Sequence, residues 1–269
     1  GKIDANSEFA FVAPLALFSA AGELTNSSAG FTPSIVGFPS YPDPATAVNV
    51  FGTLYRDDNL DLTVAYGFFD GAAGADGVAT GRRGPSTFFS DDKSNDFFHI
   101  AEAQLAWQQL GVLSFGSVGL GGWHHTGDFD TFDGGNDSGT SGLYATFQQR
   151  LTGDPAEDAA DGLYIFGQLG FADGDVAEVE QHYAVGLVQA GLGSFRPDDA
   201  VGLYVSFVDL SDAAGAGFEE DETVVEAFYR LQVTPAISVQ PGLQFVINPS
   251  GDPDIDDALV GSLRASFTF

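Results

Sequence analysis

The sequence predicts an all-β protein, a transmembrane antiparallel up-and-down β-barrel, on three observations. Apolar and polar residues alternate with a period of two over stretches of about nine residues or more, which is typical of strands and long enough for a tilted strand to cross a bilayer. The connections between these stretches alternate between short and long. The composition, with 35 Gly, 25 Phe and no Met among 269 residues, favours strands and turns over helices.

The alternating segments follow one another along the chain and predict a single domain, residues 1–269. The first, Gly1 to Ala10, is predicted as the end of a strand. The others lie at about 46–56, 60–70, 98–110, 112–126, 143–151, 161–172, 179–191, 201–210, 225–233, 237–247 and 259–269, which makes about twelve. The expected apolar face includes Leu143, Phe147, Leu231, Phe245 and Phe267, and the opposite, inward face includes Gln148, Arg230, Gln244 and Arg264. Gln149 is the one exception in its segment.

Short and long joins are expected at opposite ends of the barrel. The joins at Asp57 to Asn59, Leu110–Gly111 and Thr234–Pro235 are tight, whereas those at about 11–45, 71–97, 127–140, 211–222 and 248–257 are long. Outer-membrane barrels have short periplasmic turns and long outer loops. With the C-terminus in the periplasm, all these long joins fall outside. The periplasmic joins at about 153–160 and 192–200 are longer than usual, and the outer loop near 173–178 is short.

The charge is strongly negative and is placed mainly in the predicted outer loops. The net charge of −29 repels phosphate backbones and excludes nucleic acid as a partner. The predicted outer loops hold 22 of the 38 acidic residues and, as basic residues, only Arg82, Arg83 and Lys93. The excess of acid therefore indicates a solvated rim. The absence of Cys excludes disulfides and thiolate chemistry.

A soluble extracellular glycan-binding β-sandwich is the alternative of another class, because soluble sheets also bury one face. Three features favour the barrel. The polar faces combine Gln, Arg, Glu and Tyr, as a wet lumen would, and aromatic pairs such as Phe68–Phe69 and Phe97–Phe98 lie near strand ends. The chain closes on Phe269, as in the C-terminal strand recognised by outer-membrane assembly machinery. We therefore expect the outer membrane of a Gram-negative-type cell, with its lipids and that machinery as partners.

Enzymatic and metal sites are weakly indicated. His124 and His125 lie near Asp128, but adjacent strand residues point to opposite faces, and no serine stands in a G-x-S-x-G setting. We predict no catalytic residue and no cofactor.

Alternate carboxylates in two loops could hold Ca²⁺, but neither loop has the EF-hand spacing, so loose cation binding is the stronger expectation. These weak calcium candidates are Asp128, Asp130, Asp133, Asp252, Asp254 and Asp256.

The inward faces supply candidate pore-lining residues. A channel selective for neutral sugars needs aromatic faces for stacking and polar groups that replace the hydrogen bonds of water. For any single residue, lining water or pairing across strands is the stronger expectation. The candidates are Tyr144, Gln148, Arg150, Tyr164, Gln168, Tyr204, Glu226, Phe228, Arg230, Gln232, Gln240, Gln244 and Arg264. The segment Phe9 to Pro42 is too long for a plain surface loop, and we expect it to fold inward as a constriction or to pack on the rim.

The segment from Tyr229 to Phe269 resembles the end of the OprB-type carbohydrate-selective porins, with their Gln-Val-Thr-Pro turn, Val-Gln-Pro strand and Ile-Asn-Pro loop. GKIDANSEFA (Gly1 to Ala10), WHHTGDF (Trp123 to Phe129) and GLYATFQQRL (Gly142 to Leu151) add to the resemblance. It implies a sixteen-stranded barrel of which this chain would hold the C-terminal two-thirds or more, without about four N-terminal strands. A fragment and a reduced barrel of twelve strands both stay open.

The resemblance implies passive, sugar-selective diffusion of small carbohydrates through the outer membrane. The acidic mouth makes a general or cation-preferring porin the alternative among barrels. The preferred sugar, the pore size, a homo-oligomeric state and a signal peptide are left open by the sequence.

Overall fold

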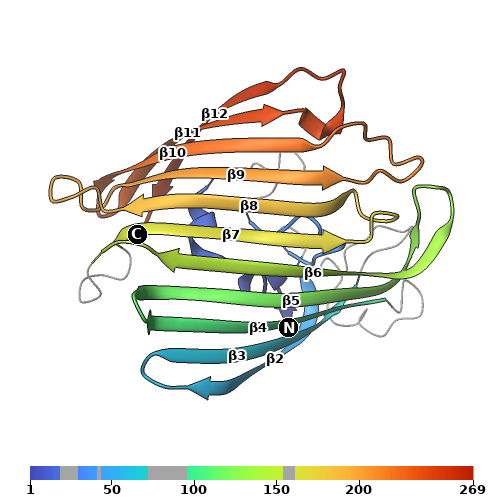
Figure 1. Cartoon of the computed structure of the whole chain (residues 1–269), viewed down its shortest axis with the longest axis horizontal. Coiled ribbons are helices and arrows are strands. Elements are labelled where there is room, and N and C mark those ends of the chain that lie inside the picture. The colour runs from blue at the N-terminus through green and yellow to red at the C-terminus, as the bar shows by residue number, and fades with distance from the viewer. Residues whose placement is uncertain (19–29, 41–43, 72–95, 154–160, 269) are drawn as a thin grey trace.

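The computed structural model describes residues 1–18, 30–40, 44–71, 96–153 and 161–268. They form one antiparallel sheet of 12 strands, in which each strand pairs with its neighbours in sequence (Figure 1). The strands are β1 (Lys2–Ile3), β2 (Ala45–Arg56), β3 (Leu60–Asp70), β4 (Phe97–Leu110), β5 (Leu113–Asp130), β6 (Asn136–Arg150), β7 (Gly162–Ala172), β8 (Val179–Ala190), β9 (Ala200–Leu210), β10 (Glu222–Thr234), β11 (Ile237–Ile247) and β12 (Ala258–Phe267). Short 3₁₀ helices occur at η1 (Ala5–Ser7), η2 (Ala13–Leu17) and η6 (Pro249–Gly251). No helix in the described part of the chain is long and apolar enough to cross a membrane.

The two faces of the sheet reverse the pattern of a soluble protein. On the outer face Leu143, Leu263 and Phe267 are 65%, 73% and 64% exposed. On the inner face the polar side chains of Gln168 and Glu226 are 1% and 0% exposed. The transfer of apolar side chains of this size out of water lowers the free energy, so the outer face suits a lipid environment.

The strand register confirms the alternation expected from the sequence. Phe245 of β11 lies beside Leu259 on the outer face, while the neighbouring Gln244 lies beside Glu226 on the inner face. Gln149, the polar exception on the outer face, is satisfied within the sheet, because its Oε1 accepts a hydrogen bond from Trp107 Nε1 at 3.1 Å. Its side-chain NH₂ group donates to two main-chain carbonyls, so the polar atoms of Gln149 have hydrogen-bond partners within the sheet even on the face that suits lipid.

Two expectations about strand length were wrong. The join at 127–140 is largely a continuation of the β5–β6 hairpin, in which Asp128 pairs with Ser138 and Asp130 with Asn136. Its Gly, Ser and Asp residues are poor strand formers and conceal a pairing that the hairpin register maintains across a bulge. At the other end of the chain, the strand expected over Gly1 to Ala10 is limited to Lys2–Ile3, because Asp4 caps the η1 turn.

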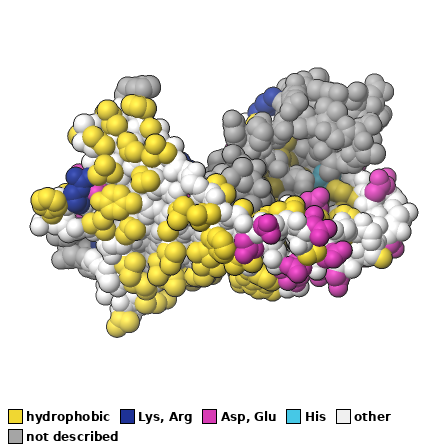
Figure 2. All heavy atoms as spheres, turned by 90° about the horizontal axis from the view of Figure 1, so that it is seen from above, with side chains coloured by type: hydrophobic (Ala, Val, Ile, Leu, Met, Phe, Trp, Pro, Cys, Tyr) yellow, Lys and Arg dark blue, Asp and Glu magenta, His cyan; other side chains and the backbone are white. Residues whose placement is uncertain are grey.

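The acidic side chains gather at the end of the sheet that carries the longer loops. Figure 2 shows them there, while apolar side chains cover much of the visible strand surface. At the other end tight turns join β2 to β3, β4 to β5 and β10 to β11, as at Asp57, whose backbone N–H donates to the carbonyl of Leu60 at 2.9 Å, while the joins from β6 to β7 and from β8 to β9 are longer. This asymmetry agrees with an acidic rim on the outside and short turns in the periplasm.

The sheet curves around the N-terminal part of the chain, which lies against its inner face (Figure 1). Phe18 contacts rings on β7, β9 and β10, and its carbonyl oxygen accepts a hydrogen bond from Arg264 on β12. In a flat sheet, the five spacings from β7 to β12 would separate these strands by about 24 Å. One residue can reach all of them only if the sheet is strongly curved. In the described residues β12 pairs only with β11, so the sheet has two edges.

Candidate functional site

The candidate site is the inner face of the sheet together with the segment that covers it, residues 5–18 and 30–40, here called the inner segment. Of the two alternatives that the sequence left for Phe9 to Pro42, folding inward or packing on the rim, the described parts agree with the first, since they lie on the inner face. Residues 19–29 and 41–43 lie outside the described part. The inner segment is attached at three places.

The first attachment lies against β2 to β6. Phe9 is fully buried, and its ring centroid lies 6.2 Å from that of Phe69. The next residue, Ala10, donates its backbone N–H to Glu102 Oε2 at 2.9 Å. The same carboxylate oxygen accepts the hydroxyl of Tyr144 at 2.8 Å, so Glu102 links the inner segment to the wall.

The second attachment is an aromatic cluster around Phe18. Its ring centroid lies 5.6 Å from Phe166, 5.2 Å from Tyr204 and 4.8 Å from Phe228. The wall makes room with glycine: a Cβ on Gly202 would lie 2.3 Å from Phe228 and 2.9 Å from Phe18. Buried aromatic pairs of this geometry stabilise beyond their burial alone, so this cluster holds the inner segment firmly.

Polar groups complete the second attachment. Gln240 Nε2 donates to the carbonyl oxygen of Leu17 at 2.5 Å, and Arg264 Nη2 donates to that of Phe18 at 3.0 Å. The carbonyls at the end of a short helix lack partners within the helix. β11 and β12 therefore supply the donors that this end of η2 needs.

The third attachment joins Thr32 to the buried His182 of β8. Thr32 Oγ1 lies 3.0 Å from His182 Nδ1, and Ser206 Oγ lies 2.9 Å from His182 Nε2. Ser34 Oγ lies 3.0 Å from Thr32 Oγ1. Both ring nitrogens of this fully buried histidine thus have partners, as buried polar groups require.

Two cavities remain between the inner segment and the wall. The larger cavity, of about 550 Å³, is lined by Gln104, Gln148, Tyr164 and Arg230 among others. The smaller cavity, of about 320 Å³, lies near the β10–β11 turn and is lined by Arg230, Gln232, Gln240, Ser238, Arg264 and others. Each is large enough to hold a small polar molecule.

The structure divides the thirteen pore-lining candidates into two groups. Six line one or both cavities, namely Gln148, Tyr164, Arg230, Gln232, Gln240 and Arg264. The other seven are buried on the inner face, namely Tyr144, Arg150, Gln168, Tyr204, Glu226, Phe228 and Gln244. Among the four aromatic candidates, only Tyr164 lines either cavity, since Tyr204 and Phe228 pack on Phe18.

Arg150 and Glu226 take part in the wall. Arg150 Nε donates to the carbonyl of Thr152 at 3.0 Å, and its guanidinium lies 5.4 Å from the centre of the Phe115 ring. Glu226 Oε2 accepts from Gln244 Nε2 at 3.3 Å across the β10–β11 pair. These contacts hold strand ends and neighbouring strands together.

Two of the six calcium candidates, Asp133 and Asp252, accept local hydrogen bonds. Asp133 Oδ1 accepts from Thr131 Oγ1 at 2.6 Å, which together with the Gly135 backbone N–H holds the pKa of Asp133 below its usual range. Asp252 Oδ1 accepts from the backbone N–H of Asp254 at 2.9 Å. In the parts of the chain that the structure describes, no three His, Asp or Glu side chains converge as a metal site would require.

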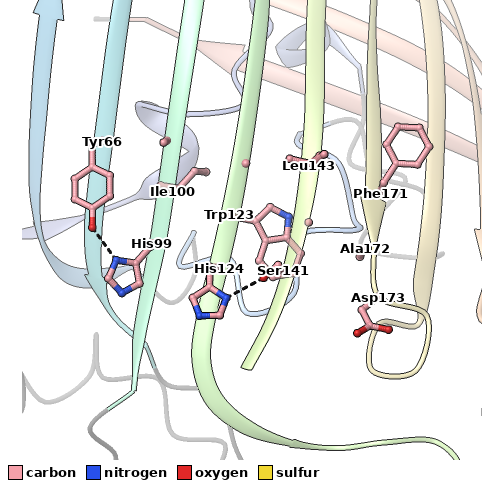
Figure 3. A pocket seen from close by; sticks show the side chains of 13 residues that line it. Tyr66, His99, Ile100, Trp123, His124, Ser141, Leu143, Phe171, Ala172 and Asp173 are labelled. Carbon is pink, nitrogen blue, oxygen red and sulfur yellow. Dashed lines mark hydrogen bonds between the residues drawn. The ribbon is translucent and has the colours of Figure 1, made fainter. Parts of the chain in front are cut away.

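A hollow of about 600 Å³ occupies the outer face at the end that carries the acidic rim (Figure 3). Tyr66 Oη lies 2.7 Å from His99 Nδ1, and Ser141 Oγ lies 2.8 Å from His124 Nδ1. His125 points inward and is buried, so the two adjacent histidines do point to opposite faces. That His99 and His124 lie side by side could not be predicted from local patterns, because it depends on the register between β4 and β5.

The inner segment also uses residues that were not among the candidates. Glu102, His182, Phe18 and Thr32 make its main contacts, yet none stands in a recognisable motif. The signal that could have pointed to Phe18 is its place in Phe9 to Pro42, a segment that is too long for a plain surface loop.

Comparison with known proteins gives a consistent result. The family model described as "Carbohydrate-selective porin, OprB family" matches residues 1–269. Porin B of Pseudomonas aeruginosa is 25% identical over 206 residues, which cover 63% of this chain and 45% of that protein. Porin AaxA of Chlamydia abortus is 31% identical over 131 residues, or 48% of this chain and 28% of that protein. The chain thus spans less than half the length of these relatives.

A solved structure supports the fold. The high-pH structure of Pseudomonas putida OprB superimposes with a TM-score of 0.76 at 20% sequence identity, over 100% of this chain and 68% of that one. Its low-pH structure gives a TM-score of 0.54, over 84% of this chain and 56% of that one. Both likenesses concern the arrangement of the strands.

Proposed function

We propose, because this chain belongs to the carbohydrate-selective porin (OprB) family, that it forms the wall and constriction of an outer-membrane channel for passive diffusion of small sugars. No cofactor and no covalent step are needed for this activity. The sugar moves down its gradient through the water-filled space that the inner segment leaves open. The side chains of the lumen act by replacing water around its hydroxyl groups.

The observation that carries this proposal is the pair of cavities beside the inner segment. Both are lined by amide and hydroxyl groups together with apolar side chains such as Leu17, and Tyr164 offers an aromatic ring in the larger one. Sugars present hydroxyls at their edges and C–H groups on their faces, so amides and a ring fit both parts. A wide water-filled pore would need neither the inner segment nor its three attachments.

Block of ion current by glucose tests this function. In the intact barrel reconstituted in planar bilayers, we expect millimolar glucose to reduce the ion current. Tyr164→Ala should weaken this block several-fold, because it removes one aromatic contact with the sugar. Tyr183→Ala is the matched control, because Tyr183 lies on the outer face and should leave the block unchanged. Absence of glucose block, or equal loss in both variants, would contradict a sugar path at Tyr164.

A cation-preferring porin is the second candidate, because acidic residues gather at the outer rim (Figure 2). Salt at 0.15 M screens charges beyond about 8 Å, so the influence of the rim on a permeant ion fades at high salt. Neutralising Asp128, Asp130 and Asp133 should change cation preference at low salt and leave the glucose block nearly intact. Cation selectivity that persists at molar salt, without any sugar block, would favour this second function.

A further inference from the structure

Three polar side chains lie in a row across the inner face of β10, β11 and β12. Gln240 of β11 is the register partner of Arg264 of β12. On the other side, Phe228 faces Gly242 and Leu231 faces Val239, a register that places Arg230 beside Gln240. Two guanidinium groups therefore flank one amide, on the same face of three adjacent strands.

Arg230 differs from its two neighbours in the use of its donors. Gln240 and Arg264 donate to the carbonyls of Leu17 and Phe18 and so hold the inner segment. Arg230 makes no ion pair in the described part of the chain, and its buried Nε has no hydrogen-bond partner there. A buried guanidinium donor without a partner is costly, which indicates that it serves a ligand.

The surroundings of Arg230 contain no competing carboxylate. Arg230 and Leu17 line both cavities, so Arg230 stands where the two meet. Although the chain has 38 acidic residues, none of the described residues that line either cavity is Asp or Glu. The charge around Arg230 is therefore opposite in sign to the rest of this very acidic protein.

We propose that Arg230 binds the anionic group of an acidic sugar, a carboxylate or a phosphate, while the cavities hold its hydroxyl-bearing part. A guanidinium offers parallel N–H donors that match two oxygens of either group. Gln148 and Tyr164 in the larger cavity, and Gln232 and Ser238 in the smaller, supply partners for hydroxyls. This inference rests on the proposed function and narrows it to a class of substrate.

The test compares D-gluconate with glucose as blockers of ion current through the intact barrel in planar bilayers. We expect gluconate to block at about tenfold lower concentration than glucose, because a charge-assisted bidentate contact adds to the same hydroxyl contacts. Arg230→Gln should bring the ratio of the two blocking concentrations close to one, and Arg230→Lys should give an intermediate ratio, since it keeps the charge but loses the fork.

Arg56→Gln is the matched control, because it removes the same charge from a residue that lines neither cavity and pairs with Asp61. Both blocking concentrations should stay unchanged in it. The acidic-sugar site would be overturned, with glucose block still in place, if gluconate blocked at no lower concentration than glucose. It would also be overturned if Arg230→Gln left the ratio of the two blocking concentrations unchanged. Failure of both sugars to block would overturn the proposed function as well.

Phosphate compounds distinguish a sugar site from a site for any small anion. Glucose 6-phosphate should block more strongly than inorganic phosphate at equal concentration, because only the sugar phosphate fills the cavities. Equal block by the two, lost together in Arg230→Gln, would show a simple anion site and would overturn the sugar part of the proposal.

Discussion

Removal of the Phe18 ring should release the part of the inner segment around η2 from the wall, because the second attachment depends on this ring. Phe18 is 3% exposed and contacts three aromatic rings at centroid distances of 4.8 to 5.6 Å. Phe→Ala at such a site costs about 3–5 kcal/mol. If all of this cost falls on docking, the ratio of docked to released segment falls by a factor of about 150 or more. The hydrogen bonds from Gln240 and Arg264 to the carbonyls of Leu17 and Phe18 would then be the remaining contacts of the second attachment.

Single-channel recording of the intact barrel can measure this release. We expect Phe18→Ala to give larger or strongly fluctuating conductance and a weaker glucose block, because the constriction opens. Phe195→Ala is the matched control, since Phe195 lies in the turn between β8 and β9 and is 90% exposed. If Phe18→Ala had the same conductance and the same glucose block as the unchanged chain, the role given to this aromatic cluster would be refuted.

Two other predictions follow from the wall itself. Leu263→Arg places a charge on the outer face of β12 and should lower the free energy of unfolding in lipid vesicles by about 2–4 kcal/mol if the residue lies near the bilayer midplane. Ser262→Arg, on the inner face, should lower it much less. Equal losses in the two variants would mean that the register is wrong. The hydrogen bonds from Arg196 hold the pKa of Asp199 at about 2, with help from Tyr229 and the backbone N–H of Gln232. Since the folded pKa is depressed, this stabilisation is present above about pH 4 and is lost as the pH falls toward 2. Thermal unfolding should therefore lose less stability over that range in Asp199→Asn, and an identical pH dependence in both proteins would argue against the contact.

The strands were predictable because their signal is local. A period of two specifies which residues share a face, and the register between strands follows once one face must avoid water. The β5–β6 extension was missed because Asp128 to Asp130 and Asn136 to Ser138 have the composition of a loop. Their pairing comes from the hairpin that precedes them and not from their own propensity.

The inner site was only partly predictable, because it depends on contacts between distant parts of the chain. Alternation places Tyr144, Tyr164 and Tyr204 on one face but gives no means of telling which of them the inner segment covers. The contact between Gln240 and Leu17 spans 223 positions in sequence. A residue's role in the lumen is therefore decided by a partner that no local pattern reveals.

The inner segment determines the chemistry of the lumen by what it covers. The inner wall carries apolar residues such as Ile100, Phe166 and Phe228, which would be costly to leave facing water. Both large apolar clusters on this face include residues of the inner segment, Phe9 in one and Phe18 in the other. Docking thus covers a large part of the apolar surface of the wall. The cavities that remain open combine amides, hydroxyls, Tyr164 and the guanidinium groups of Arg230 and Arg264 with apolar side chains such as Leu17 and Val188, so the same contacts that narrow the channel also leave a surface with both polar and apolar parts, as a sugar requires.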